Sequence, residues 1–238
     1  MKPTVTLLIL FLAWLQPATA AADMTNDPFG AARKTMVYTQ IRSRGVSDPA
    51  VLRAMEKVPR HLFVPEKVRA HAHADRPLAI GFGQTISQPY VVALMTALLD
   101  LTKDSRVLEV GTGSGYQAAI LSQIAKAVFS VEIVEPLHTR AKQTLKETGC
   151  ANVTSISRDG FYGWEAHAPY DAIIVTCAAE SVPPPLIRQL KIGGVMCIPV
   201  GPPFRVQNLL RITRRAENDI RTEVISQVLF VPLTRQQK

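Results

Sequence analysis

Three acidic residues that lie in or after apolar runs are the side chains best placed for chemistry. Glu109 comes just before a glycine-rich loop, Glu132 ends the run V-F-S-V-E, and Asp159 follows the run at 153–157. An acid about 20 residues after such a loop can accept hydrogen bonds from both hydroxyls of a ribose. A carboxylate at Asp159 could accept one from the exocyclic amine of adenine. These positions indicate a site for an adenine nucleoside.

The glycine-rich loop narrows the choice of ligand. Residues 111–115 read G-T-G-S-G, and glycines allow positive φ and let the backbone pass close to a ligand. A dinucleotide fold would show G-x-G-x-x-G, whereas this loop is G-x-G-x-G with Glu109 ahead of it. That spacing favours a nucleoside with a cationic amino-acid tail, and with the three acids it indicates S-adenosylmethionine (SAM). In the alternative interpretation, Glu109 and Glu132 are ordinary solvated charges.

The residues that we expect to bind the cofactor are therefore Glu109, Gly111, Thr112, Gly113, Gly115, Glu132, Asp159 and Gly160. A metal is not expected. The three cysteines show no C-x-x-C pair, and His71 and His73 are two residues apart, a spacing that does not share a helix face.

The elements that must position these residues alternate along the chain. Residues 107–110 read as a buried strand and 116–125 as a helix, and strands are also expected at 128–131, 153–157, 170–176 and 195–201. A helix is expected from the prolines at 183–185 to the glycines at 193–194, and a terminal hairpin from 207–213 and 220–233. We predict an α/β fold: a doubly wound, mostly parallel seven-stranded sheet with helices on both faces and a C-terminal antiparallel hairpin.

Residues from about 29 to 80 are predicted to form a helical cap. The run 29–45 has helical spacing with a basic face, Asp48-Pro49 begins a second helix, and 59–80 reads as irregular and basic. A second glycine-containing stretch, G-F-G-Q-T-I-S-Q-P-Y at 81–90, is rich in hydroxyl groups. It is either a second centre of chemistry or a surface loop ahead of a helix at 90–99.

The first 22 residues resemble a secretory signal peptide. Lys2 precedes an apolar stretch at 5–15 that is too short to span a bilayer, and an A-x-A site follows. We therefore divide the chain into this segment and a single domain at 23–238. Export would place the protein in the periplasm, whereas the supply of SAM favours the cytoplasm, so both compartments stay open.

Composition limits the partners. The net charge of +8 permits nucleic acid, yet no aromatic platform or basic recognition helix accompanies the charges, and an acidic substrate would satisfy them equally. The strand at 170–176 is followed by C-A-A-E at 177–180 and not by the N-P-P-Y or D-P-P-Y tetrapeptide of enzymes that methylate amino groups of DNA. We expect no nucleic-acid partner, no stable membrane span and a monomer.

Several of these stretches together resemble the protein-L-isoaspartate O-methyltransferase family. They are G-Q-T-I-S-Q-P at 83–89, the run 107–121, Glu132, Asp159-Gly160, Y-D-A-I-I-V-T at 170–176 and F-V-P-L at 230–233. The resemblance extends from about residue 33 to the C-terminus. Ala79 stands where the family commonly has proline, and Arg158 where it commonly has glycine.

The resemblance implies methyl transfer from SAM to the α-carboxylate of L-isoaspartyl residues in aged proteins and peptides. The ester would cyclise to succinimide, which begins a repair; activity on D-aspartyl residues stays open. By family match Ser87 is placed against the substrate carboxylate, and Gln84 and Thr85 shape the same loop. The alternatives are a methyltransferase for nucleic acids or small molecules and a SAM-binding module without catalysis.

Overall fold

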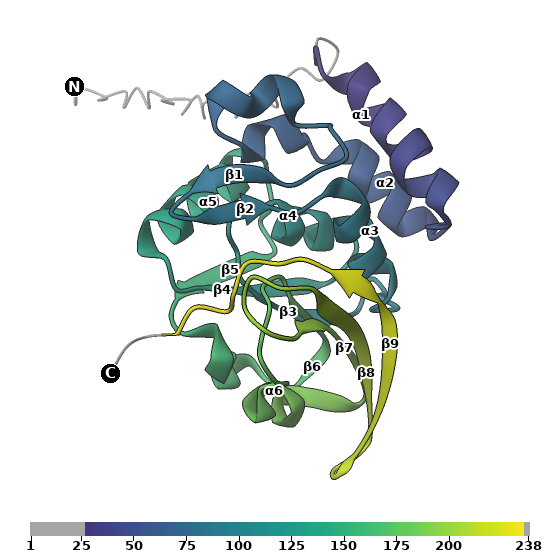
Figure 1. The fold of residues 1–238 in the computed structure, drawn as a ribbon, viewed down its shortest axis with the longest axis vertical. Helices are drawn as coiled ribbons and strands as arrows, with labels where there is room; N and C mark the ends of the chain where they lie inside the picture. The colour runs from purple at the N-terminus through teal and green to yellow at the C-terminus, as the bar shows by residue number, and fades with distance from the viewer. Residues whose placement is uncertain (1–26, 236–238) are drawn as a thin grey trace, which may run out of the picture.

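The computed structural model describes residues 27–235, and a seven-stranded sheet forms its centre (Figure 1). The strands lie in the order β5-β4-β3-β6-β7-β8-β9. The first five are parallel, and β8 is antiparallel to both of its neighbours. Their bounds are β3 Arg106–Val110, β4 Ala127–Glu132, β5 Val153–Ser157, β6 Tyr170–Val175, β7 Leu190–Val200, β8 Gln207–Ala216 and β9 Asp219–Val228. The predicted fold class is confirmed.

The direction of winding reverses at β3. From β3 the chain proceeds outward through β4 to β5, and it then returns to place β6 on the other side of β3. Ligands of doubly wound sheets bind at such a switch point, beyond the carboxyl ends of the strands. The ends of β3 and β6 therefore mark where a site is expected.

Both faces of the sheet are covered. Alternate residues of the strands enter two separate cores, as Val107 and Leu108 do in β3. One core packs beneath α3 (Pro89–Ala97), α4 (Tyr116–Ser122) and α5 (Glu135–Glu147), and the other beneath α6 (Pro184–Gln189) with two short 3₁₀ turns. No helix within residues 27–235 is long and apolar enough to cross a membrane.

The N-terminal cap begins with a helix that changes its winding. The α-helix α1 (Gly30–Met36) continues as a π-helical turn (Val37–Ile41) and a 3₁₀ turn (Arg42–Arg44), and ends at Gly45 with φ of 95°. The helix α2 (Pro49–Lys57) starts as predicted, because the Asp48 carboxylate accepts hydrogen bonds from the amides of Ala50 and Val51. The segment 1–22 lies outside the described residues.

Residues 59–90 are more regular than the sequence indicated. Two 3₁₀ helices (Arg60–Phe63 and Glu66–His71) come first, followed by a small hairpin of β1 (Leu78–Gly81) and β2 (Gln84–Ile86). The hydroxyl-rich stretch is therefore part of an ordered hairpin that leads into α3.

Two predicted boundaries were wrong. The helix α6 ends at Gln189, and the glycines at 193 and 194 lie inside β7. A Cβ at Gly194 would approach the Asp171 carbonyl oxygen to 2.9 Å, so this glycine allows β7 to pack closely against the neighbouring strand. The last strand ends at Val228, and the chain then leaves the sheet because Val231 and Leu233 pair with Ala178 instead.

All three cysteines, Cys150, Cys177 and Cys197, are buried and free. Burial raises the pKa of the Cys197 thiol to about 12, and burial also raises that of Cys177 well above its usual value. These residues pack as small apolar side chains, as their number and spacing predicted.

Candidate functional site

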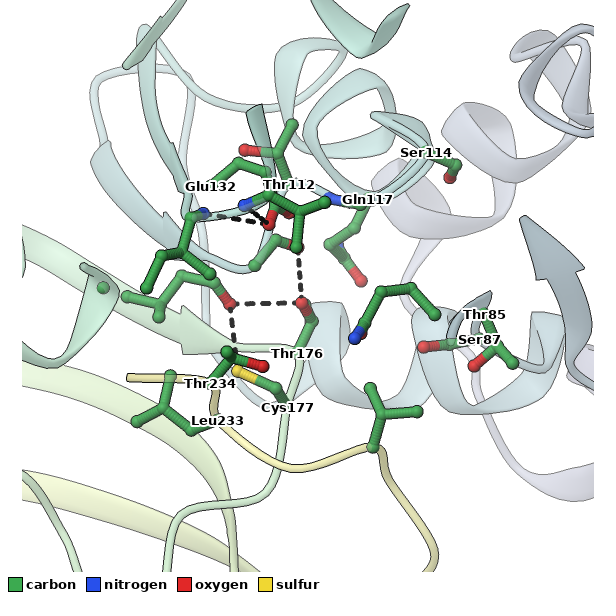
Figure 2. Close-up of a pocket in the computed structure, with 18 of the residues that line it drawn as sticks. Thr85, Ser87, Thr112, Ser114, Gln117, Glu132, Thr176, Cys177, Leu233 and Thr234 are labelled. Atoms are coloured by element: carbon green, nitrogen blue, oxygen red, sulfur yellow. Dashed lines mark hydrogen bonds between the residues drawn. The ribbon is translucent and has the colours of Figure 1, made fainter. Parts of the chain in front are cut away.

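A cavity opens at the switch point of the sheet. Its wall combines the loop after β3, the end of β4, residues 176–177 after β6, the hairpin residues 84–87 and the tail at 231–234. Figure 2 shows Glu132 and Thr112 on one side of this pocket and Thr85 and Ser87 on the other. Segments that are far apart in sequence therefore meet in one hollow.

Glycine is needed in the loop after β3. Gly111 has φ of 96°, and a Cβ there would lie 2.6 Å from the Thr176 hydroxyl oxygen. That hydroxyl donates a hydrogen bond of 2.6 Å to the Gly111 carbonyl, which ties the ends of β3 and β6 together. Gly111, Thr112 and Gly113 line the cavity. Gly115 does not; a Cβ on it would face Ala141 and Leu145 of α5, so this glycine allows two helices to pack.

The Glu132 carboxylate is held at the cavity wall by backbone amides. One oxygen accepts hydrogen bonds from the amides of Ile133 and Val134, each at 2.9 Å, and the other accepts one from the Gly113 amide at 2.7 Å. The residue is 6% exposed. Since a carboxylate oxygen can accept two hydrogen bonds, the oxygen bound to Gly113 keeps an acceptor position for a ligand hydroxyl. The geometry fits the predicted role in ribose binding.

The structure places Glu109 away from the cavity wall. Its side chain is fully buried, and one oxygen accepts a hydrogen bond from the Ser130 hydroxyl. Ser130 lies 2.5 Å from the hydroxyl of Thr112, which does line the cavity. The alternative of a solvated charge is wrong for Glu109, whose carboxylate is connected to the cavity wall through the hydroxyls of Ser130 and Thr112.

We expect Glu109 to make the protein less stable as the pH rises. Burial raises the pKa of its carboxyl to about 8, and the charge of Glu132 acts in the same direction. The folded protein then holds the proton more tightly than the unfolded chain, so this contribution to stability is full below about pH 4 and is lost as the pH rises through about 8. Glu109→Gln removes the titration, and urea unfolding at about pH 5 and about pH 8 should show a smaller pH dependence than in the wild type. The same fall in both proteins would contradict this.

Asp159 also lies behind the wall, whereas Gly160 lines the cavity. The Asp159 carboxylate accepts a hydrogen bond from the Phe161 amide and pairs with the Arg235 guanidinium at 2.9 Å. Arg235 stacks over the Phe161 ring at 3.7 Å. Asp159 thus anchors the C-terminal tail, and the predicted contact with adenine would add to this pairing.

The three residues of the hydroxyl-rich stretch, Gln84, Thr85 and Ser87, all line the cavity. Thr85 and Ser87 also line a second, more apolar cavity, to which Val91, Val206 and Leu229 contribute. Ser87 therefore lies where the two cavities meet.

The geometry agrees with the comparisons to known proteins. A sequence model of the protein-L-isoaspartate(D-aspartate) O-methyltransferase family matches residues 31–238. The chain belongs to this family. Protein-L-isoaspartate O-methyltransferase 2 of Shewanella sediminis is 50% identical over 232 residues, which cover 96% of this chain and 95% of the relative. The protein-L-isoaspartate O-methyltransferase of Opitutus terrae is 53% identical and covers 86% of this chain and 87% of its own.

Solved structures of the family share the fold. One protein-L-isoaspartate O-methyltransferase superposes with a TM-score of 0.78 at 28% identity, covering 85% of this chain and 66% of the other. Another, from Plasmodium falciparum in complex with S-adenosyl-L-homocysteine, gives a TM-score of 0.74 at 26% identity over 86% of this chain and 99% of the other. The chain is a SAM-dependent protein-L-isoaspartate O-methyltransferase, as the sequence motifs implied.

Several wall residues of this methyltransferase were not predicted from the sequence. They include Ser114, Gln117, Thr176, Cys177 and the tail at 231–234. Thr176 could have been found from topology, because the strand at 170–176 returns beside β3 in any doubly wound sheet. The tail matched the family in F-V-P-L at 230–233, but its place at the cavity was not predicted, because it read as the continuation of a strand.

Proposed function

We propose that the two sides of the cavity divide the reaction between them. Glu132 and the backbone of residues 111–113 hold the adenosine and amino-acid parts of SAM, and Ser87 holds the substrate carboxylate. The single observation that carries this proposal is that Ser87 shares one cavity with Glu132 and Gly111, although the sequence separates them. The site fits SAM because a Cβ at Gly111 or Gly160 would collide with Thr176 or Val110, so both positions keep the backbone close to the hollow.

Little acid–base chemistry is required. When bound, SAM supplies an electrophilic methyl group, and the attacking oxygen belongs to the substrate. A peptide α-carboxyl group has a pKa of about 3.5, so it is already ionised at neutral pH and a general base would gain little. Alignment of oxygen, methyl and sulfur can contribute on the order of 7–11 kcal/mol through proximity and orientation. The task of the chain is therefore to position the reactants.

Ser87 would perform this positioning by donating a hydrogen bond from its hydroxyl to the carboxylate. The second cavity begins at Ser87 and extends along apolar side chains of α3, β9 and the loop at 204–206. A substrate that is part of a polypeptide needs such a path, because the chain on either side of the isoaspartyl residue must leave the site. This supports damaged proteins and peptides as substrates, with Gln84 and Thr85 shaping the loop beside them.

The basic residues near the final hairpin do not require a nucleic-acid partner. Arg211 pairs with Asp100 and Glu223, and Arg215 pairs with Asp219. Much of the positive charge there is neutralised within the protein. We therefore retain the proposal that the enzyme acts without nucleic acid. We also retain the proposal of a monomer, which sedimentation velocity of the purified chain tests.

A methylation assay with matched peptides tests the proposed substrate. Two peptides of one sequence, one with L-isoaspartate and one with L-aspartate, are incubated with the enzyme and radiolabelled SAM. We expect label in the isoaspartyl peptide alone, released as methanol when the ester cyclises. A D-aspartyl peptide extends the series. Equal labelling of both peptides, or label only in added RNA, would contradict the proposal.

The compartment remains a proposal with two alternatives. The supply of SAM and the usual cytoplasmic location of the family support the cytoplasm, and the signal-like residues 1–22 support the periplasm. We expect deletion of residues 1–22 to leave methylation unchanged, since described residues from Gln84 onward already form a continuous wall around the cavity. Cell fractionation with N-terminal sequencing decides between the two: a periplasmic chain beginning near Ala21 or Asp23 would defeat the cytoplasmic alternative.

A further inference from the structure

A completely buried arginine contacts the backbone of Ser87. Arg60 begins the first 3₁₀ helix after α2 and is 0% exposed. Its guanidinium donates one hydrogen bond of 2.7 Å from Nε to the Ala72 carbonyl and another of 2.7 Å from Nη2 to the Ser87 carbonyl. The side chain thus connects the N-terminal cap to the loop that carries Ser87.

The charge of Arg60 lacks a carboxylate partner. Among the described residues, no acidic side chain lies within ion-pair distance of it, and its Nη1 has no hydrogen-bond partner. Burial lowers its pKa to about 10, so the group stays charged at neutral pH. Burying an unpaired charge costs free energy. The two hydrogen bonds to the Ala72 and Ser87 carbonyls offset part of this cost, so they are the contacts that a role for Arg60 would depend on.

Those contacts reach both sides of the cavity. Ser87 lies between β2 and α3, and the carbonyl of Gln88, the next residue, accepts the first hydrogen bond of α3. The Arg60 guanidinium also lies 4.7 Å from the centre of the Tyr116 ring. Tyr116 is the first residue of α4, directly after the glycine-rich loop, and it lines the cavity. One side chain therefore spans the distance between the substrate loop and the cofactor loop.

We propose that Arg60 is a positioning residue for methyl transfer, which sets the backbone of Ser87 relative to the glycine-rich loop. It acts through Ser87 and Tyr116 and does not itself touch the reactants. The inference rests on the proposed role of Ser87. It predicts that weakening the contact of Arg60 with Ser87 lowers turnover more than it lowers SAM affinity.

The test compares Arg60→Lys with Arg33→Met. Arg33 is a matched control because it is also a buried arginine of the cap, with contacts to Asp27 and the Glu56 carbonyl and none to the cavity. We expect Arg60→Lys to lower kcat for an isoaspartyl peptide roughly tenfold or more, with the dissociation constant of SAM nearly unchanged by calorimetry. Arg33→Met should lower the melting temperature and leave kcat near that of the wild type.

A double variant shows whether Arg60 acts through Ser87. If it does, adding Arg60→Lys to Ser87→Ala should lower kcat by much less than the same change does in the wild type. Independent effects, in which the two substitutions lower kcat by factors that multiply, would overturn the proposal, as would an unchanged kcat in folded Arg60→Lys.

A second variant is needed if Arg60→Lys does not fold. Arg60→Gly refolded with methylguanidinium then replaces it, and kcat should rise with the concentration of methylguanidinium. Failure of both variants to fold, while Arg33→Met folds, would make Arg60 a folding residue and would also overturn it. Absence of methylation by the wild type would instead refute the proposed function.

Discussion

Ser87→Ala is expected to slow methylation of an isoaspartyl peptide roughly 10- to 150-fold without abolishing it. The estimate follows from the loss of one hydrogen bond to a charged carboxylate, worth about 1.5–3 kcal/mol, converted into a rate. The affinity for SAM should barely change, because the residues assigned to the cofactor lie on the other side of the cavity. Steady-state kinetics with the peptide and calorimetry with SAM measure the two effects separately.

The same experiment excludes a covalent role for Ser87. The attacking oxygen comes from the substrate, so no methylated enzyme intermediate is expected. Ser43→Ala is a suitable control, because Ser43 is exposed in the cap and its hydroxyl bonds only to the Thr39 carbonyl. Full activity of Ser87→Ala, or methyl-serine recovered from the wild-type enzyme by mass spectrometry, would be inconsistent with positioning.

Glu132→Ala is expected to weaken SAM binding roughly tenfold to a hundredfold. The physical reason is the loss of a charged acceptor for the ribose. The structure adds a second reason. The same carboxylate accepts hydrogen bonds from the amides of Gly113, Ile133 and Val134 and so orders the cavity wall. Calorimetric titration of the folded variant with SAM gives the change directly.

Two further variants show whether a loss of SAM affinity is specific to the carboxylate of Glu132. Glu135→Ala removes a neighbouring acid that bonds to Ser157 and does not line the cavity, and it should bind SAM as the wild type does. Glu132→Gln keeps one oxygen acceptor but loses the charge, so its affinity should lie between those of Glu132→Ala and the wild type. Unchanged affinity in Glu132→Ala would remove this residue from the site.

The central strands could be predicted because parallel strands covered on both faces are apolar along their length. The run 107–110 and the run 170–176 are of this kind, and glycines marked the loop between β3 and α4. The same reasoning failed at β7, where Lys191 and the two glycines read as a helix end. The close approach of the neighbouring strand, which is a tertiary contact, explains Gly194, and the positive φ of 83° explains Gly193.

The site was predictable where a residue type is demanded by the backbone. Gly111 needs positive φ and lacks room for a Cβ, and Glu132 ends a strand beside the loop. Burial could not be predicted with equal success. Glu109 follows the sequence pattern of a ligand-binding acid, yet its place between two strands, facing Ser130, is set by the register of β3 with β4. Arg60 has no sequence pattern at all, since its partners are backbone carbonyls from distant segments.

The burial of all three cysteine thiols limits how the protein responds to the redox state of its surroundings. Thiol–disulfide exchange needs an accessible thiolate, and burial together with the raised pKa values of Cys177 and Cys197 leaves little of it. Oxidants therefore meet little reactive thiolate in the described residues, and reductants find no disulfide to break there. Thiol–disulfide exchange is expected to leave the described domain unchanged in an oxidising as well as in a reducing compartment.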